Sequence, residues 1–363
     1  MRLKDLLALI GIVSIAGIVC WFLYRNTSVQ PLTAEEKNMI DFLFTKTKAQ
    51  CVGRYIFEVP DSFINTRHDS AKINEMRITS KRISRPAFEQ RIRLREQELA
   101  KGHTVRVIDQ PFLKQVYRLK DNAIIFDRNE NESVPGFGRI LEGHLFSNDV
   151  AFIMHSEITD YSDERFTKER DFFLRDEANP ATANTKPQNL AEMHDLISRL
   201  SGREDDSIPV QPGTCIPDGF IADGKGKGKE DSTLFFQQSG IIIYAKTNNY
   251  LKRNESLLDW GRRDIEPVLN KLHSHTLHKG KVSLPDMDAE EWLIKGKQEV
   301  RGNIVDGYRF IFNANETIAD YHHPLLSVQL HNASLVSDTY NTAQLVDIWE
   351  RITRTFRLRP NAF

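Results

Sequence analysis

Hydrophobic and polar residues show two periodicities along the chain, and these distinguish predicted strands from predicted helices. Short runs rich in β-branched and aromatic residues predict strands, whereas apolar residues spaced three or four apart predict helices. The predicted strands are 51–59, 74–83, 116–119, 123–127, 138–145, 150–158, 215–222, 233–238, 241–247, 307–313 and 325–331. The predicted helices are 34–47, 86–103, 190–200, 256–272 with Ser256 as its cap, and a last helix capped by Thr342.

A polar segment divides these elements into two groups. Residues 201–214 are rich in acidic residues, proline and glycine, which is typical of a boundary between domains. Both groups mix strands with helices and lack regular βαβ alternation, so they indicate an α+β fold. A chain of 363 residues also suits two domains better than one core. We therefore expect two mixed strand/helix domains, residues 40–203 and 213–361.

The first 25 residues have the composition of a membrane anchor or signal. Residues 6–24 carry no charged side chain, and as a helix they span about 29 Å, close to the hydrocarbon thickness of a bilayer. Arg2 and Lys4 precede this run, and positive residues tend to stay in the cytoplasm. We expect one transmembrane helix in the inner membrane with the body in the periplasm. A cleaved signal is the alternative, although bulky residues follow the run where small ones are preferred.

The three cysteines are relevant to whether the body of the protein lies in an oxidising compartment. Cys20 lies inside the apolar run, which leaves Cys51 and Cys215 in the body. In an oxidising compartment these two could form a disulfide, which would stabilise the fold by about 4–5 kcal/mol in the chain-entropy model. Two buried free thiols are the alternative.

Overall charge is nearly balanced, with 49 Lys and Arg against 50 Asp and Glu. No global field therefore attracts nucleic acid, and we expect no nucleic-acid partner. Hydrophobic residues make up 40% of the chain and charged residues 27%, which indicates a globular protein.

Motifs for catalysis or phosphate binding are absent from the sequence. It has no nucleophile elbow and no zinc-protease helix motif, and Gly226 stands where a phosphate loop needs Ser or Thr. The segment 224–229 (GKGKGK) instead predicts a flexible hairpin loop. Its lysines, Lys225, Lys227 and Lys229, are weak candidates for contact with an acidic partner surface.

Two further groups could suggest a metal, and in both the plainer interpretation is favoured. The histidines are His273, His275 and His278, with His322 and His323 later in the chain, and such a local run is more often solvated than bound to zinc.

The acidic pair Asp286 and Asp288 could hold the metal of a membrane-anchored glycosyltransferase. The same residues also fit the start of a short helix, where acids are favoured, and we prefer this interpretation. We therefore predict no catalytic residue, no cofactor and no metal site.

Several stretches resemble the immunity proteins of type VI secretion phospholipase effectors, a family with separate N- and C-terminal immunity domains. Residues 51–55 (CVGRY) resemble its opening strand, and residues 215–221 (CIPDGFI) resemble the start of its C-terminal domain. Residues 345–360 resemble its closing helix and Arg-Leu-Arg-Pro tail. Residues 299–312 resemble its strand pair, which crosses a glycine turn.

The resemblance covers roughly residues 40–361. It implies a non-enzymatic, two-domain α+β inhibitor that grips a cognate lipase effector in the periplasm and blocks its active-site entrance. No catalytic or interface residue carries over, because the matching positions are framework residues. A membrane-anchored envelope binding protein and, less favoured, the metal-dependent glycosyltransferase remain the alternatives.

Overall fold

A computed structural model describes residues 29–66, 68–119, 122–176, 179–336 and 339–363. The apolar run 6–24, with Cys20, lies outside these ranges. Within them, no helix is long and apolar enough to cross a membrane.

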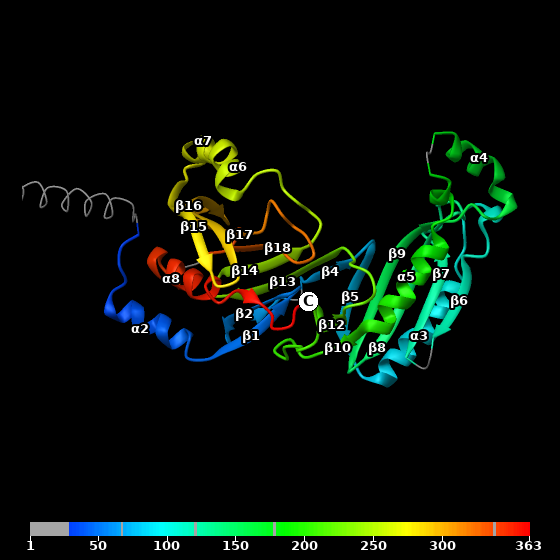
Figure 1. Cartoon of the computed structure of the whole chain (residues 1–363), viewed down its shortest axis with the longest axis horizontal. Helices are drawn as coiled ribbons and strands as arrows, with labels where there is room; N and C mark the ends of the chain where they lie inside the picture. Colours follow the sequence, from blue (N-terminus) through cyan, green and yellow to red (C-terminus); the bar gives the residue numbers. More distant parts are fainter. Residues whose placement is uncertain (1–28, 67, 120–121, 177–178, 337–338) are drawn as a thin grey trace, which may run out of the picture.

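Strands dominate the described chain, with helices between and around them (Figure 1). The helices are α2 (Ala34–Leu43), α3 (Arg85–Ala100), α4 (Thr167–Asp176), α5 (Lys186–Arg199), α6 (Leu257–Asp264), α7 (Glu266–Leu269) and α8 (Thr342–Thr353), with 3-10 turns η1 (Val107–Asp109), η2 (Glu164–Phe166), η3 (Pro180–Ala183) and η4 (Asn270–Leu272). The strands of the first half are β1 (Thr47–Val52), β2 (Tyr55–Pro60), β3 (Ile64–Asn65), β4 (Ser70–Ile73), β5 (Met76–Arg82), β6 (Leu113–Leu119), β7 (Ala123–Asn129), β8 (Gly138–Ser147), β9 (Val150–Thr159) and β10 (Leu200–Gly202). Those of the second half are β11 (Gly213–Ile216), β12 (Gly219–Ala222), β13 (Glu230–Gln238), β14 (Ile241–Asn248), β15 (His275–Leu284), β16 (Met287–Val300), β17 (Asn303–Ala314), β18 (Leu325–His331) and β19 (Arg357–Leu358). The predicted α+β class is confirmed.

One antiparallel sheet of 13 described strands runs through the molecule. Its order is β15-β16-β17-β18-β14-β13-β4-β5-β9-β8-β7-β6, and β3 also pairs with β13. The hairpin β4–β5 therefore joins the strands of the second half to those of the first. Two smaller sheets, β1-β2-β19 and β10-β12-β11, lie beside it.

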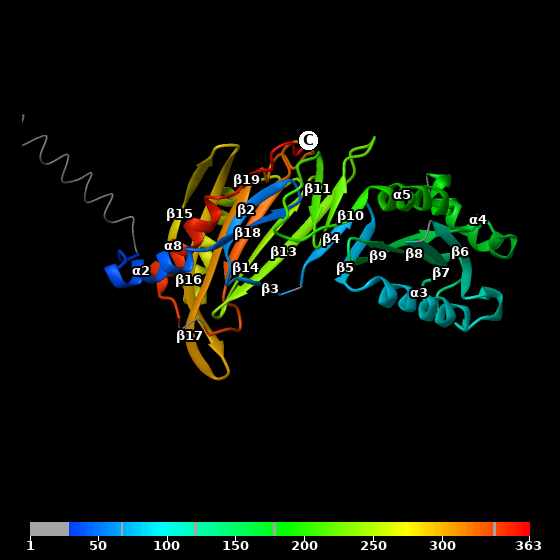
Figure 2. The same ribbon diagram turned by 90° about the horizontal axis from the view of Figure 1, so that it is seen from below.

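One end of the large sheet is a three-layer unit, called here the helix-flanked lobe (β5–β9 with α3 and α5). Alternation along β7–β9 sends Ile124 and Phe126 towards α3, whereas Ile125 and Met154 face α5. Figure 2 shows the two helices on opposite sides of the strands. Both faces of this part of the sheet are therefore covered by helix.

The other end, called here the double-sheet lobe, packs β13–β18 against the small sheet β1-β2-β19 and helix α8. Its core is rich in aromatic side chains, and Phe57 of β2 stacks on Phe356 with ring centroids 4.4 Å apart. Phe310 of β17 lies edge-on to Trp349 of α8. The first hairpin of the chain thus completes the core of the second half.

Two predicted strands are in fact hairpins. Residues 51–59 turn at Gly53 and Arg54, and Gly53 has a φ of 56°, which favours glycine. Residues 215–222 turn at Pro217 and Asp218. In both runs apolar residues stand on either side of a two-residue turn. The sequence pattern therefore gave no sign that the chain reverses its direction there.

Three helix predictions also need correction. The helix 34–47 ends at Leu43, because Thr47 already pairs in β1. The helix 256–272 is divided into α6, α7 and η4, and Ser256 makes no side-chain cap bond to it. The last helix is capped by Asn341 rather than Thr342, since the Asn341 side chain accepts the Gln344 N–H.

A disulfide between Cys51 and Cys215 joins β1 to β11. Both residues are fully buried, and their Cα atoms lie 5.8 Å apart. Beside the bond, Gly53 and Cys215 exchange two backbone hydrogen bonds of 2.9 and 2.8 Å. The first hairpin is therefore tied covalently to the opening hairpin of the second half.

Replacing both Cys51 and Cys215 with serine should lower the free energy of unfolding by about 2–5 kcal/mol, because the denatured chain gains the freedom of a long open loop. Urea unfolding under oxidising conditions measures the loss. The reduced wild-type protein is the matched control and should unfold near the double variant. Equal stability of all three would contradict the structural role of the bond.

Candidate functional site

Arg54, at the turn between β1 and β2, has no solvent-exposed side-chain surface. Its guanidinium forms paired hydrogen bonds with two carboxylates, at 3.1 and 2.7 Å to Asp223 and at 3.2 and 2.6 Å to Glu230. It also donates to the carbonyl of Ala362 and lies 4.2 Å from the ring centre of Tyr321. Burial opposes its charge, but the two carboxylates outweigh burial and raise the pKa of Arg54 above its ordinary value.

Asp223 and Glu230 stand at the two ends of the segment 224–229, called here the lysine loop. Arg54 therefore clamps both ends of this loop while leaving its middle in solvent. The predicted hairpin at this position is wrong, because the loop connects β12 of one sheet to β13 of another. Figure 2 shows it as a light-green loop standing beside the C-terminus, over the junction of the lobes.

The three lysines of this loop are exposed, and two of them lie over aromatic rings. Lys227 Nζ lies 4.6 Å from the ring centre of Tyr321 and 3.3 Å from Nε2 of His322. Lys229 Nζ lies 5.7 Å from the ring centre of Tyr250. Rings hold lysine side chains through cation–π attraction without neutralising them. The loop thus presents a positive and aromatic surface, which suits an acidic region of a protein partner.

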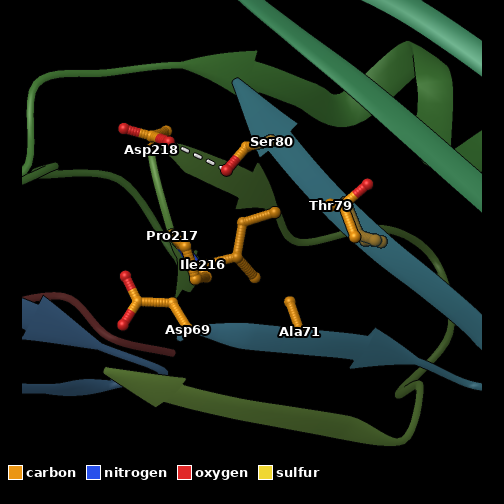
Figure 3. A pocket seen from close by; sticks show the side chains of 8 residues that line it. Asp69, Ala71, Thr79, Ser80, Ile216, Pro217 and Asp218 are labelled. Carbon is orange, nitrogen blue, oxygen red and sulfur yellow. Dashed lines mark hydrogen bonds between the residues drawn. The ribbon is translucent and has the colours of Figure 1, made fainter. Parts of the chain in front are cut away.

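A small cavity of about 140 Å³, lined by both polar and apolar residues, lies between β4–β5 and the turn of β11–β12 (Figure 3). Asp218 accepts a hydrogen bond of 2.8 Å from the Ser80 hydroxyl and forms an ion pair of 3.2 Å with Arg82. These contacts tie the turn to β5. Asp69 accepts from the Phe235 N–H, and burial raises its pKa to about 6. These bonds serve to join the lobes.

The predicted histidines and acids do not form a metal site. No group of three or more His, Cys, Asp or Glu residues in the described ranges could hold a metal ion. His275 and His278 lie exposed on β15. The proposed helix start at Asp286 and Asp288 is wrong, because Asp286 lies in the turn of hairpin β15–β16 and Asp288, in β16, pairs with Ser283 of β15.

The sequence patterns did not indicate the central residues of this site, which are Arg54, Asp223, Glu230 and Tyr321. A signal did exist, because an acid stands near each end of the glycine-lysine segment and an arginine follows Cys51 by three positions. Nothing local indicates that the three charges meet, since Arg54 and Glu230 are 176 residues apart.

Replacing Arg54 with methionine should cost about 3–5 kcal/mol of unfolding free energy, because two largely buried carboxylates lose their counter-charge. Chemical denaturation measures this loss. The matched control is Arg263→Met, which breaks exposed ion pairs with Glu255 and Asp264 and should cost far less than the Arg54 substitution. Equal losses at the two positions would show that Arg54 does not hold the structure together.

Replacing Asp69 with asparagine should alter how stability depends on pH. The raised pKa of Asp69 means that the folded protein keeps a proton between about pH 4 and 6 that the unfolded chain has released. The free energy of unfolding of the wild type should therefore fall as pH rises through this window. That of the variant should not show this fall. Melting temperatures of both proteins from pH 4 to pH 7 measure it; parallel curves would contradict the assignment.

Comparison with known proteins agrees with this arrangement. Residues 48–203 match the N-terminal domain of Tle cognate immunity protein 4, and residues 207–361 match its C-terminal domain. No curated protein sequence matches the chain.

Three solved structures share the fold. Two are of the type VI secretion immunity protein TplEi from Pseudomonas aeruginosa. The apo form has 17% identity and a TM-score of 0.68, covering 87% of this chain and 98% of that one. The form complexed with "L" peptide has 16% identity and a TM-score of 0.64, covering 87% and 99%. The third, the Tle4–Tli4 complex, has 16% identity and a TM-score of 0.67, covering 87% and 98%.

The family match extends over both halves in order and accounts for most of the chain. It makes the protein an inhibitor rather than an enzyme, so the glycosyltransferase alternative is wrong. The chain belongs to the Tle cognate immunity protein 4 family.

Proposed function

We propose that this protein binds a toxic phospholipase effector of type VI secretion in the periplasm and obstructs its active-site entrance. The observation that carries the proposal is the match of both halves to the two domains of one immunity-protein family. The solved complex of Tle4 with Tli4, which shares the fold, adds an example of such a protein in complex.

The anchored ends of the lysine loop support a binding role. A loop that is ordered before binding loses less conformational entropy in the complex, and more of its contact energy appears as affinity. Arg54 fixes the two ends of the loop through its hydrogen bonds to Asp223 and Glu230. The rings of Tyr321 and Tyr250 contact the side chains of two of its lysines.

The proposed location rests on two features. Residues 6–24 have the length and composition of a single inner-membrane span. A buried disulfide between Cys51 and Cys215 suits an oxidising compartment such as the periplasm. We propose that the span holds the body on the periplasmic side.

The direct test is protection of cells. Cells that export the cognate type VI lipase effector to the periplasm should survive only when the full-length chain is also made. In solution, the purified chain should capture that lipase and reduce its activity in stoichiometric proportion. Survival without the chain, or full lipase activity in its presence, would overturn the proposal.

Reversing the charge of Lys225, Lys227 and Lys229 to glutamate should slow association with the lipase at least about tenfold at low salt, because charge complementarity steers the encounter. Stopped-flow or surface binding kinetics at two salt concentrations measure this. The matched control reverses three exposed lysines on other elements, namely Lys46, Lys101 and Lys281. An equal effect of both triple variants would show that the lysine loop has no specific part in binding.

A further inference from the structure

The three lysines of the lysine loop differ in how firmly the structure holds them. Lys227 Nζ lies 4.6 Å from the ring centre of Tyr321 and has no ion-pair partner in the described chain. Lys229 Nζ lies 3.8 Å from a carboxylate oxygen of Glu75, which offsets part of its charge. The side chain of Lys225 makes no ion pair, hydrogen bond or ring contact within the described ranges. Lys227 is therefore the lysine that is both positioned and unpaired among the described residues of this loop.

The hydrogen-bond donors of Lys227 are only partly used. A lysine ammonium has three N–H donors and no acceptor, so Nε2 of His322 accepts the bond of 3.3 Å between them. The other two donors make no hydrogen bond to the part of the chain that the structure describes. Because a ring and an imidazole already hold the side chain, Lys227 loses little conformational entropy when a partner binds it. Lys227 can thus bind a carboxylate directly, whereas Lys225 must first become ordered.

Tyr321 connects Lys227 to the buried network of Arg54. Its hydroxyl donates a hydrogen bond of 2.6 Å to Asp223, and its ring centre lies 4.2 Å from the Arg54 guanidinium. Burial and the hydrogen bond to Asp223 raise the pKa of Tyr321 to about 12, so the hydroxyl keeps its proton and remains a donor. The ring that holds Lys227 is therefore itself fixed by two contacts.

An aromatic surface lies next to this lysine. The ring centre of Phe363 lies 5.4 Å from that of Tyr321 and 5.0 Å from that of His322, and 36% of Phe363 remains exposed. Exposed aromatic rings supply apolar contact area at protein interfaces. A cation beside such a ring matches an acidic residue that has an apolar neighbour.

Two exposed carboxylates favour a protein partner over a membrane. Glu75 lies beside Lys229, and Asp320 immediately precedes Tyr321. An extended anionic surface, such as a phospholipid bilayer, brings many negative charges towards both carboxylates, and like charges repel. A single carboxylate on a protein contacts Lys227 with much less of this repulsion.

We propose that Lys227 is the residue through which the lysine loop recognises a carboxylate side chain of the effector lipase. Phe363 covers an apolar neighbour of that carboxylate. Lys225 and Lys229 contribute through long-range charge alone. Tyr321 is a positioning residue, because it acts through Lys227. This proposal rests on the proposed function and names the contact within the lysine loop that determines specificity.

The test replaces each lysine of the loop singly with methionine in the full-length chain and measures binding to the cognate type VI lipase effector. Lys227→Met should weaken binding at least about 30-fold, mainly through faster dissociation and also at high salt, because it removes a direct contact. Lys225→Met and Lys229→Met are the matched controls, and each should weaken binding less than about threefold and only at low salt. All three positions are exposed, so each variant should keep the wild-type melting temperature.

A double-variant cycle tests the role of Tyr321. Tyr321→Leu removes the ring and should weaken binding about tenfold, whereas Tyr321→Phe keeps the ring and should stay within about threefold of the wild type. Combined with Lys227→Met, Tyr321→Leu should add little further loss, since both changes remove the same contact. Additive losses would show that Tyr321 does not act through Lys227.

The outcomes separate this proposal from the proposed function. If the wild type does not bind the lipase, the proposed function fails. If the wild type binds and Lys227→Met binds equally well, or the three methionine variants lose equal affinity, the proposal for Lys227 alone is overturned. It is also overturned if Lys227→Met weakens binding to phosphatidylglycerol vesicles and not to the lipase, because the lysine then serves a membrane contact.

Discussion

The buried guanidinium of Arg54 is the interaction on which the arrangement of this protein depends. It joins the turn of the first hairpin, both ends of the lysine loop and the C-terminal Ala362 in one network. An arginine without solvent exposure is tolerable only if its charge and donors are matched, and here two carboxylates and a carbonyl match them. Segments from the start, middle and end of the chain are thereby fixed to one another.

The disulfide and the strand order also connect the two halves of the chain. Cys51 is joined to Cys215 next to Arg54, and Phe57 lies in the core beneath α8. The hairpin β4–β5 continues the large sheet into the helix-flanked lobe. Because these links are covalent, hydrogen-bonded and apolar, the two halves of the chain are joined by more than one kind of force.

The sequence by itself determined the type of most elements and the bounds of the strand 325–331. These features depend on alternation and turn chemistry within about ten residues, and the printed sequence contains that information. The ordered motifs at residues 51–55, 215–221 and 345–360 likewise indicated the family. The candidate lysines were found in the same way, because their glycine spacing is local.

Only the tertiary structure decided that residues 51–59 fold as a hairpin and complete the core of the second half. It also brought Arg54 to Glu230 across 176 residues. The physical reason is that burial and counter-charge are properties of the packed chain. A charged residue in the sequence shows neither whether it will leave water nor which distant charge will balance it.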